Sequence, residues 1–175
     1  RLSENIKESK SGSSSIKTNT TRISDSDGDS DSETAQEYIE RIEKINDDDD
    51  KQEEVIKLAT IALKFEKSSV AYAYRSNAKS QLGKYKGAIK DITKAIEITP
   101  VSSWYYVRAA MKFQLENYEG AINDYNNAIE LDPNDIDALQ GRGESKILLH
   151  DFSGALTDYK KAIKIEPENS TSFTG

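Results

Sequence analysis

The sequence predicts an all-α protein in which stacked antiparallel helix pairs follow a disordered N-terminal tail. Three observations lead to this fold class. Two short sequence phrases recur at a near-constant interval through most of the chain, and the apolar residues within them are spaced as on one face of a helix. Residues 1–33, by contrast, are mostly serine, threonine, lysine and acidic residues with few apolar side chains.

The predicted tail spans residues 1–33. Its apolar side chains are isolated aliphatic residues, and it contains no aromatic residue. Such a segment cannot offset the roughly 1–2 kcal/mol of backbone entropy that ordering costs per residue. Residues 24–33 alternate serine and acid, but with Gly28 as the sixth residue of a calcium loop, Ile23 and Thr34 would be first and twelfth, where carboxylates are needed. We therefore interpret this stretch as a solvated acidic linker, and phosphorylation of its serines is left open.

Composition limits the partners. The 175 residues include 24 Lys and Arg against 31 Asp and Glu, a formal net charge of −7. The excess of acid disfavours nucleic acid and anionic membranes as partners. With no cysteine and one histidine, the chain has no thiol nucleophile, no disulfide and few routes to a tight transition-metal site. We expect no metal and no other cofactor.

The sequence also bears on localisation. No apolar run approaches the roughly 20 residues that span a bilayer, and the first residues lack the apolar centre of a signal peptide. We therefore expect a soluble, cytoplasmic protein. Because the chain begins with Arg1 rather than Met, removal of a targeting segment is the open alternative.

Three prolines mark an internal repeat. Pro100, Pro133 and Pro167 lie 33 and 34 residues apart, and each ends a similar phrase: GAIKDITKAIEITP, GAINDYNNAIELDP and GALTDYKKAIKIEP. A second shared phrase lies upstream of each, beginning at Arg75, Arg108 and Arg142. Both phrases have helical period, and only a tight turn fits between them. Each repeat is therefore predicted to be an antiparallel helix pair.

The pattern resembles the tetratricopeptide repeat, a 34-residue helix-turn-helix unit, over roughly residues 69 to 169. In that register small residues stand where helices cross closely, with an aromatic residue nearby and proline at the end. The matching small residues are Ser76, Ala109 and Gly143 in the first helices, and Ala88, Ala95, Ala121, Ala128, Ala155 and Ala162 in the second. The resemblance implies a right-handed α-α superhelix and a non-enzymatic protein-interaction module.

The expected organisation follows from this register. After the tail at 1–33 come a degenerate helical-hairpin repeat at 34–68 and three regular repeats at 69–101, 102–135 and 136–169. Residues 170–175 would begin a truncated further repeat or cap. In the degenerate repeat Glu43 replaces the small residue, Thr34 and Glu37 suit a capping box, and Asp47 to Asp50 make the turn and cap the next helix.

Three departures from the family pattern recur in every regular repeat. Arginine and lysine stand four residues apart in the first helix, where the family has apolar residues, and an aspartate recurs in the second helix. We interpret them as an Arg-to-Asp ion pair between the helices that sets their register, and anion binding by the arginines is the alternative. The third departure is a glycine in the first turn of each second helix, which close backbone packing would explain. The residues are Arg75, Arg108 and Arg142; Lys79, Lys112 and Lys146; Asp91, Asp124 and Asp158; and Gly87, Gly120 and Gly154.

The resemblance also implies where a partner would bind. A stack of this kind binds peptides in a concave groove built by the first helices, and we expect Tyr74, Tyr106 and Phe113 to be its main contacts unless they pack between neighbouring repeats. Some members of the family clamp the carboxylate tail of a partner with basic and amide side chains. At the corresponding positions of this chain, only Asn77 carries the family's residue type. The groove positions are Val70, Ala73, Tyr74, Asn77, Ser80, Ser103, Tyr106, Val107, Ala110, Phe113, Asp137, Gln140, Gly141, Glu144 and Ile147.

The function predicted is therefore a protein-protein interaction scaffold that binds a peptide segment without a carboxylate clamp. No nucleophile, phosphate loop or metal-spaced cluster indicates an enzyme, and His150 occupies the turn position that Gly83 holds in another repeat. One alternative is a structural spacer or self-assembling array, with Trp104 as a surface contact and self-association through an uncapped C-terminal end. The other is a regulatory segment of a larger enzyme or secretion component.

Overall fold

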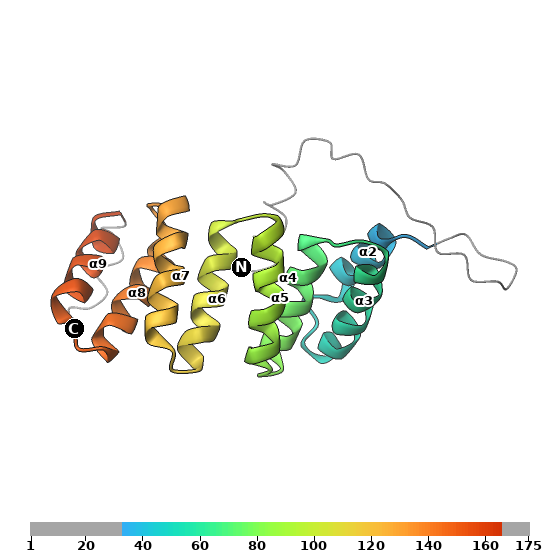
Figure 1. The fold of residues 1–175 in the computed structure, drawn as a ribbon, viewed down its shortest axis with the longest axis horizontal. Helices are drawn as coiled ribbons and strands as arrows, with labels where there is room; N and C mark the ends of the chain where they lie inside the picture. Colours follow the sequence, from blue (N-terminus) through green and yellow to red (C-terminus); the bar gives the residue numbers. More distant parts are fainter. Residues whose placement is uncertain (1–32, 166–175) are drawn as a thin grey trace, which may run out of the picture. The chain divides into compact units, whose positions relative to one another are not determined.

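The computed structural model describes residues 33–165, which are largely helical (Figure 1). The predictions made for the tail before residue 33 and for residues 170–175 lie outside this range. The helices of the described part are α2 (Ala35–Ile45), α3 (Gln52–Phe65), α4 (Ser69–Gln81), α5 (Tyr85–Ile98), α6 (Ser102–Gln114), α7 (Tyr118–Leu131), α8 (Ile136–Leu148) and α9 (Phe152–Ile165), with a short 3-10 helix η1 (Asp49–Lys51) before α3.

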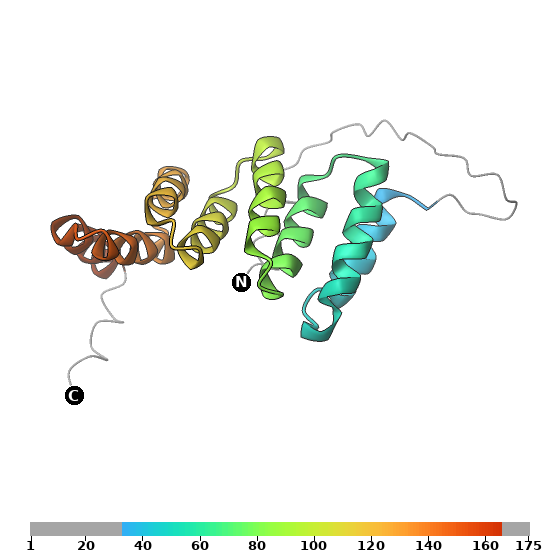
Figure 2. The ribbon, with the colours of Figure 1, turned by 60° about the horizontal axis from the view of Figure 1, so that its bottom comes forward.

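The described helices belong to two compact units, divided between Thr99 and Pro100. The first unit holds α2 to α5 and the second holds α6 to α9. Within each unit every helix packs against the next, and the first helices of the two pairs also touch: α2 with α4, and α6 with α8. The helices of each pair run antiparallel (Figure 2). The predicted all-α fold of stacked helix pairs is confirmed.

Side-chain caps fix several helix starts. The predicted capping box of α2 is present: the backbone N–H of Glu37 donates to Thr34 Oγ1, and the Thr34 N–H donates to the Glu37 carboxylate at 2.6 Å. The acidic turn after α2 differs in detail from the prediction. Asp48 caps the 3-10 helix η1 by accepting from the Asp50 N–H, whereas α3 begins after Lys51 without a side-chain cap.

In each of the three regular repeats, the turn between the paired helices contains one residue with left-handed backbone. Gly83, Glu116 and His150 have φ values of 69°, 58° and 63°. In each turn the next residue donates its N–H five residues back, which satisfies a carbonyl at the helix end; the bond from Lys84 N to Lys79 O is 2.8 Å. His150 therefore has the turn role that its position opposite Gly83 predicted.

Small residues let paired helices approach closely. The alanines of the second helices, such as Ala88 and Ala121, are fully buried. Ser76 occupies the crossing in α4, and its hydroxyl donates to the Ala88 carbonyl at 2.9 Å, so this buried polar group is satisfied. In α8 the crossing residue is Gly143, and an added Cβ there would lie 3.1 Å from Cζ of the Tyr159 ring.

A buried aspartate joins the two helices of each regular repeat. In α7, Asp124 has a side chain only 3% exposed, and it accepts from Arg108 Nε and Nη2 at 2.8 and 2.7 Å and from Lys112 Nζ at 2.8 Å. The same arrangement, with ion-pair distances of 2.5 to 2.7 Å, joins Arg75 and Lys79 to Asp91, and Arg142 and Lys146 to Asp158. The predicted ion pair is confirmed, and the lysine shares the same carboxylate.

Two of the arginines also reach the preceding helix pair of their own unit. Arg75 Nη1 donates to Thr60 Oγ1 of α3 at 3.2 Å, and Arg142 Nη1 donates to Asn126 Oδ1 of α7 at 2.7 Å.

The cations also keep the buried aspartate charged. At Asp158, burial acts to raise the carboxyl pKa, but the hydrogen bonds from Arg142 and Lys146 outweigh it and the pKa lies below its ordinary value. The buried carboxylate is therefore held in its charged form.

The recurrent glycine of the second helices has a different cause from the close backbone packing that the sequence suggested. Gly120 N donates to Oδ1 of the N-cap residue Asn117 at 3.0 Å, and an added Cβ would lie 2.6 Å from Asn117 Nδ2. Gly154 makes the same bond to Asp151. The missing side chain therefore leaves room for the cap. Gly87 has no such neighbour, because Lys84 makes no side-chain cap and the nearest atom to an added Cβ is Lys79 Cδ at 3.5 Å.

This difference predicts opposite outcomes for two alanine substitutions. Gly87→Ala is expected to raise the free energy of unfolding by up to about 1 kcal/mol, since alanine reduces the backbone freedom of the unfolded chain and meets no obstacle. Gly120→Ala is expected to give no gain, because it displaces a cap worth about 1 kcal/mol. Urea unfolding of both variants checks this, and equal gains at the two positions would contradict it.

A second prediction concerns the buried aspartate. Asp91→Asn removes the only negative charge shared by Arg75 and Lys79, and we expect it to lower the free energy of unfolding by about 3 kcal/mol in urea titrations. The control is Glu53→Gln in the same unit, which breaks the exposed pair with Lys84 and should cost less than about 1 kcal/mol. Similar effects of the two substitutions would show that the buried pair has no special role.

Candidate functional site

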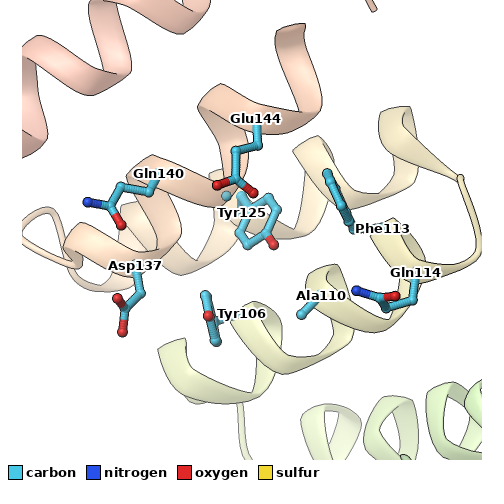
Figure 3. A pocket seen from close by; sticks show the side chains of 9 residues that line it. Tyr106, Ala110, Phe113, Gln114, Tyr125, Asp137, Gln140 and Glu144 are labelled. Atoms are coloured by element: carbon cyan, nitrogen blue, oxygen red, sulfur yellow. The ribbon is translucent and has the colours of Figure 1, made fainter. Parts of the chain in front are cut away.

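The second unit contains a pocket on the surface formed by its first helices (Figure 3). Its volume is about 230 Å³. Side chains of α6 form one wall, those of α8 form the other, and a tyrosine of α7 lies between them. The lining residues are Tyr106, Ala110, Phe113, Gln114, Tyr125, Asp137, Gln140, Gly141 and Glu144.

Aromatic rings form the apolar part of the pocket. Tyr106 and Phe113 are partly exposed and pack against the core of the second unit. The Tyr106 ring lies 5.9 Å from that of Tyr125 in a tilted arrangement, and the Phe113 ring meets Tyr118 edge to face at 5.4 Å. Rings held by neighbouring rings offer a rigid contact surface at low entropic cost.

The floor of the pocket exists because α8 has a glycine there. Tyr125 is only 4% exposed, and its ring passes so close to α8 that a Cβ on Gly141 would lie 2.9 Å from Tyr125 Cε1. Burial, together with the neighbouring Tyr106, Glu144 and Asp135, raises the pKa of the Tyr125 hydroxyl. The hydroxyl therefore keeps its proton and can donate as well as accept a hydrogen bond.

The polar lining is acidic and amide-bearing. Asp137 and Glu144 stand on α8, two turns apart, and Gln140 lies between them, with Gln114 on the opposite wall. No lysine or arginine is among the lining residues of this pocket in the described part of the chain. The site can therefore accept hydrogen bonds and attract positive charge, but it lacks the cations that hold a carboxylate.

Seven of the predicted groove residues come together in this pocket: Tyr106, Ala110, Phe113, Asp137, Gln140, Gly141 and Glu144. Gly141 opens its floor. Sequence reasoning missed Tyr125, which lies on the apolar stripe of α7, and Gln114, which follows the last groove position of α6. Neither residue carries a signal that a single sequence would show.

Other predicted groove residues are not available at the surface. Tyr74, expected to be a main contact, is only 2% exposed, and burial, together with the nearby carboxylates of Glu43 and Asp47 and a hydrogen bond to Glu43, raises the pKa of its hydroxyl. Asn77 is buried and donates to Asn46 Oδ1 at 3.5 Å. These predictions were wrong because α2, whose sequence is degenerate, covers this part of α4. Ala73 and Val107 are likewise buried.

The remaining groove positions are scattered. Val70, Ser80 and Ser103 are half-buried and Ile147 is exposed, and none of them lines the pocket. Trp104, proposed as a surface contact of a spacer, is fully buried, so that role is excluded.

Neither a metal centre nor a membrane span is found in residues 33–165. That range holds no group of three or more His, Cys, Asp or Glu side chains placed to bind a metal ion. None of its helices is long and apolar enough to cross a membrane.

The helix pairs and their surface pocket define a helical-repeat scaffold. Residues 70–102 match a family model described as the tetratricopeptide repeat, and residues 109–146 match a second model described as the TPR repeat. The chain is a tetratricopeptide-repeat protein, as its repeat pattern predicted. No curated protein sequence matches it.

Solved structures of the same fold match the chain. A MamA RS-1 double mutant has 18% identity and a TM-score of 0.72 over 77% of this chain and 76% of that one. The first TPR of Spaghetti (RPAP3), solved with the HSP90 peptide SRMEEVD, has 27% identity and a TM-score of 0.55 over 57% of this chain and 80% of that one. The second TPR of the same protein, solved with the same peptide, has 26% identity and a TM-score of 0.54 over 56% and 92%.

The raised tyrosine pKa values predict loss of stability in alkali. The pKa of an exposed tyrosine in the unfolded chain is about 10. If its pKa is higher in the folded state, the tyrosine contributes stability that is fully present below about pH 10 and is lost as the pH rises through the pKa of the folded state. Tyr74 and Tyr125 should therefore ionise only as the chain unfolds. Ultraviolet absorbance followed against pH should show a late tyrosinate step that coincides with loss of helix and shrinks in the Tyr74→Phe/Tyr125→Phe variant. A late step of unchanged size in that variant would contradict the assignment.

Proposed function

We propose that the chain is a non-catalytic scaffold that binds a peptide segment of a partner protein along the first helices of its second unit. The observation that carries the proposal is the pocket between α6 and α8, in which the partly exposed rings of Tyr106 and Phe113 stand beside polar groups. Aromatic anchors beside hydrogen-bonding groups are typical of peptide-binding surfaces.

The size of the pocket supports a side chain as its occupant. At about 230 Å³, it is smaller than the roughly 300–1,000 Å³ of typical cofactor and small-molecule sites. It also opens on the face where α6 and α8 lie next to each other, so a chain bound there could place one residue inside and contact both helices with its neighbours.

The proposed mode differs from a carboxylate clamp. The related TPR domains of Spaghetti were solved with an HSP90 peptide that ends in Glu-Glu-Val-Asp. In this chain the positions that correspond to the clamp residues of the family carry Ala73, Tyr74, Asn77, Ser103 and Val107. The pocket lining is acidic. Two carboxylates would repel an acidic peptide end.

A second candidate function is self-association. Large apolar side chains on α8 and α9 are exposed, among them Leu148, Leu156 and Ile163, and Phe152 is 62% exposed. Such surfaces commonly mark protein contacts, and a second copy of the chain is one partner that could cover this face.

The test is a selection of random 12-residue peptides on the 175-residue chain. Peptides that bind the chain are expected to lose at least about tenfold in affinity on a Tyr106→Ala/Phe113→Ala variant, because removing two anchoring rings costs a few kcal/mol. The Phe152→Ala variant is the control, since it removes an exposed ring outside the pocket.

Circular dichroism and urea unfolding must show that both variants remain folded. Peptides that bind the pocket variant as well as the unchanged chain would contradict the proposal. Peptides lost only from the Phe152→Ala variant would move the binding site to the exposed face of α8 and α9.

A further inference from the structure

We infer that the pocket between α6 and α8 is a subsite for an arginine side chain of the bound partner segment. This inference rests on the proposed function and deepens it by naming the chemistry of the anchoring residue. It is carried by the charge of the lining, by the placement of aromatic rings and acceptor groups, and by the way in which the surrounding cations are engaged elsewhere.

The charge of the pocket comes from how α6 and α8 use their basic residues. Arg108 and Lys112 are the only basic residues of α6, and both contact Asp124. Arg142 and Lys146 are the only ones of α8, and both contact Asp158. The two helices that wall the pocket therefore direct all four cations at their partner helices.

Negative charge remains on the pocket side of α8. Glu144 forms no ion pair with any residue in the range 33–165, and its side chain is exposed at the rim. Asp137, two helical turns earlier, also lines the pocket. A positively charged group is therefore the complementary occupant, and it would be attracted over a Debye length of about 8 Å at physiological salt.

The shape of the acceptor set favours arginine over lysine. Acceptors come from several directions: the Glu144 carboxylate, the side-chain oxygens of Gln140 and Gln114, and the Tyr125 hydroxyl (Figure 3). A guanidinium presents five N–H donors in a plane and can stack on an aromatic face, whereas an ammonium group is a compact, strongly hydrated charge. Tyr106 and Phe113 supply such faces beside the acceptors.

In the described part of the first unit, the equivalent position is filled by a side chain. In the repeat register Tyr74 of α4 corresponds to Gly141 of α8, and Ala59 of α3 corresponds to Tyr125 of α7. The large ring is therefore on α4, the first helix of its pair, in the first unit, and on α7, the second helix of its pair, in the second unit. Because α8 has glycine at this position, its backbone leaves a recess lined by the Tyr125 ring, whereas Tyr74 fills its own position and is buried.

The experiment uses the 12-residue peptides selected on the 175-residue chain. We expect the peptides that depend on Tyr106 and Phe113 to share one arginine. Replacing it by citrulline, which keeps the shape and removes the charge, should weaken binding about tenfold, as expected for loss of a charge-assisted hydrogen bond. Glu144→Gln should weaken binding of the arginine peptide to a similar extent.

The two changes together form a double-mutant cycle. If the arginine contacts Glu144, citrulline should cost little further affinity on the Glu144→Gln variant. Glu119→Gln is the matched control, because it removes one exposed carboxylate of α7 outside the pocket, and it should leave affinity within about twofold. Replacing the peptide arginine by lysine should weaken binding severalfold.

The outcomes separate the two levels of the argument. Peptides that depend on Tyr106 and Phe113 but share no arginine, that bind equally well with citrulline or lysine, or whose losses simply add in the cycle, would overturn the arginine subsite and leave the proposed function standing. Peptides that do not depend on the two rings at all would overturn both.

Discussion

A buried carboxylate beneath an arginine and a lysine is the interaction on which the described repeats depend. In each regular repeat the aspartate side chain of the second helix is at most 7% exposed, and two cations of the first helix close on it within 2.8 Å. A buried ion pair of this kind adds little net stability compared with apolar residues in its place, yet the loss of one charged partner leaves the other charge buried and uncompensated. We therefore regard it as a device that sets helix register, since a slip of one residue would separate Asp124 from Arg108.

The same interaction also determines which charged side chains remain on the opposite face of the first helices. A helix carries its charges on particular faces, so cations aimed at the second helix are not available on the groove side. In α6 and α8 all basic residues are used in this way. The pocket consequently keeps aromatic rings, amides and the carboxylates of Asp137 and Glu144. The ion pairs that join the helices therefore leave the pocket lining without basic residues.

Much of this structure could be predicted from the sequence, because the repeated copies can be compared with one another. Three copies of one pattern showed which positions were constrained, and they predicted both the helix pairs and the partnership of Arg108 with Asp124. The reason for the glycine in the first turn of each second helix could not be predicted in this way, since it depends on whether the residue three positions earlier caps the helix. Asn117 does so and Lys84 does not.

The groove was harder to predict, because it depends on contacts between repeats that differ. Tyr74 was expected at the surface, but α2 covers it, and α2 belongs to the repeat that departs most from the pattern. Tyr125 reaches the pocket only because Gly141, sixteen residues further along the chain, lacks a side chain. A large residue on one helix can fill the space left by a small residue on the next, and the apolar pattern of a single helix does not reveal such a pairing.

The most direct measurement of the central claim is hydrogen exchange at the arginine side chains, followed by nuclear magnetic resonance of the Nε–H groups. Arg75, Arg108 and Arg142 each donate Nε–H to a buried aspartate at 2.8 to 2.9 Å. The Arg41 side chain is 50% exposed, and within the described residues it is Nη1 rather than Nε that lies 3.4 Å from the Glu33 carboxylate. The account predicts three Nε–H signals that exchange far more slowly than that of Arg41. Each should lose its protection when the aspartate of its own repeat becomes asparagine. Exchange at one common rate for all four arginines would contradict the account.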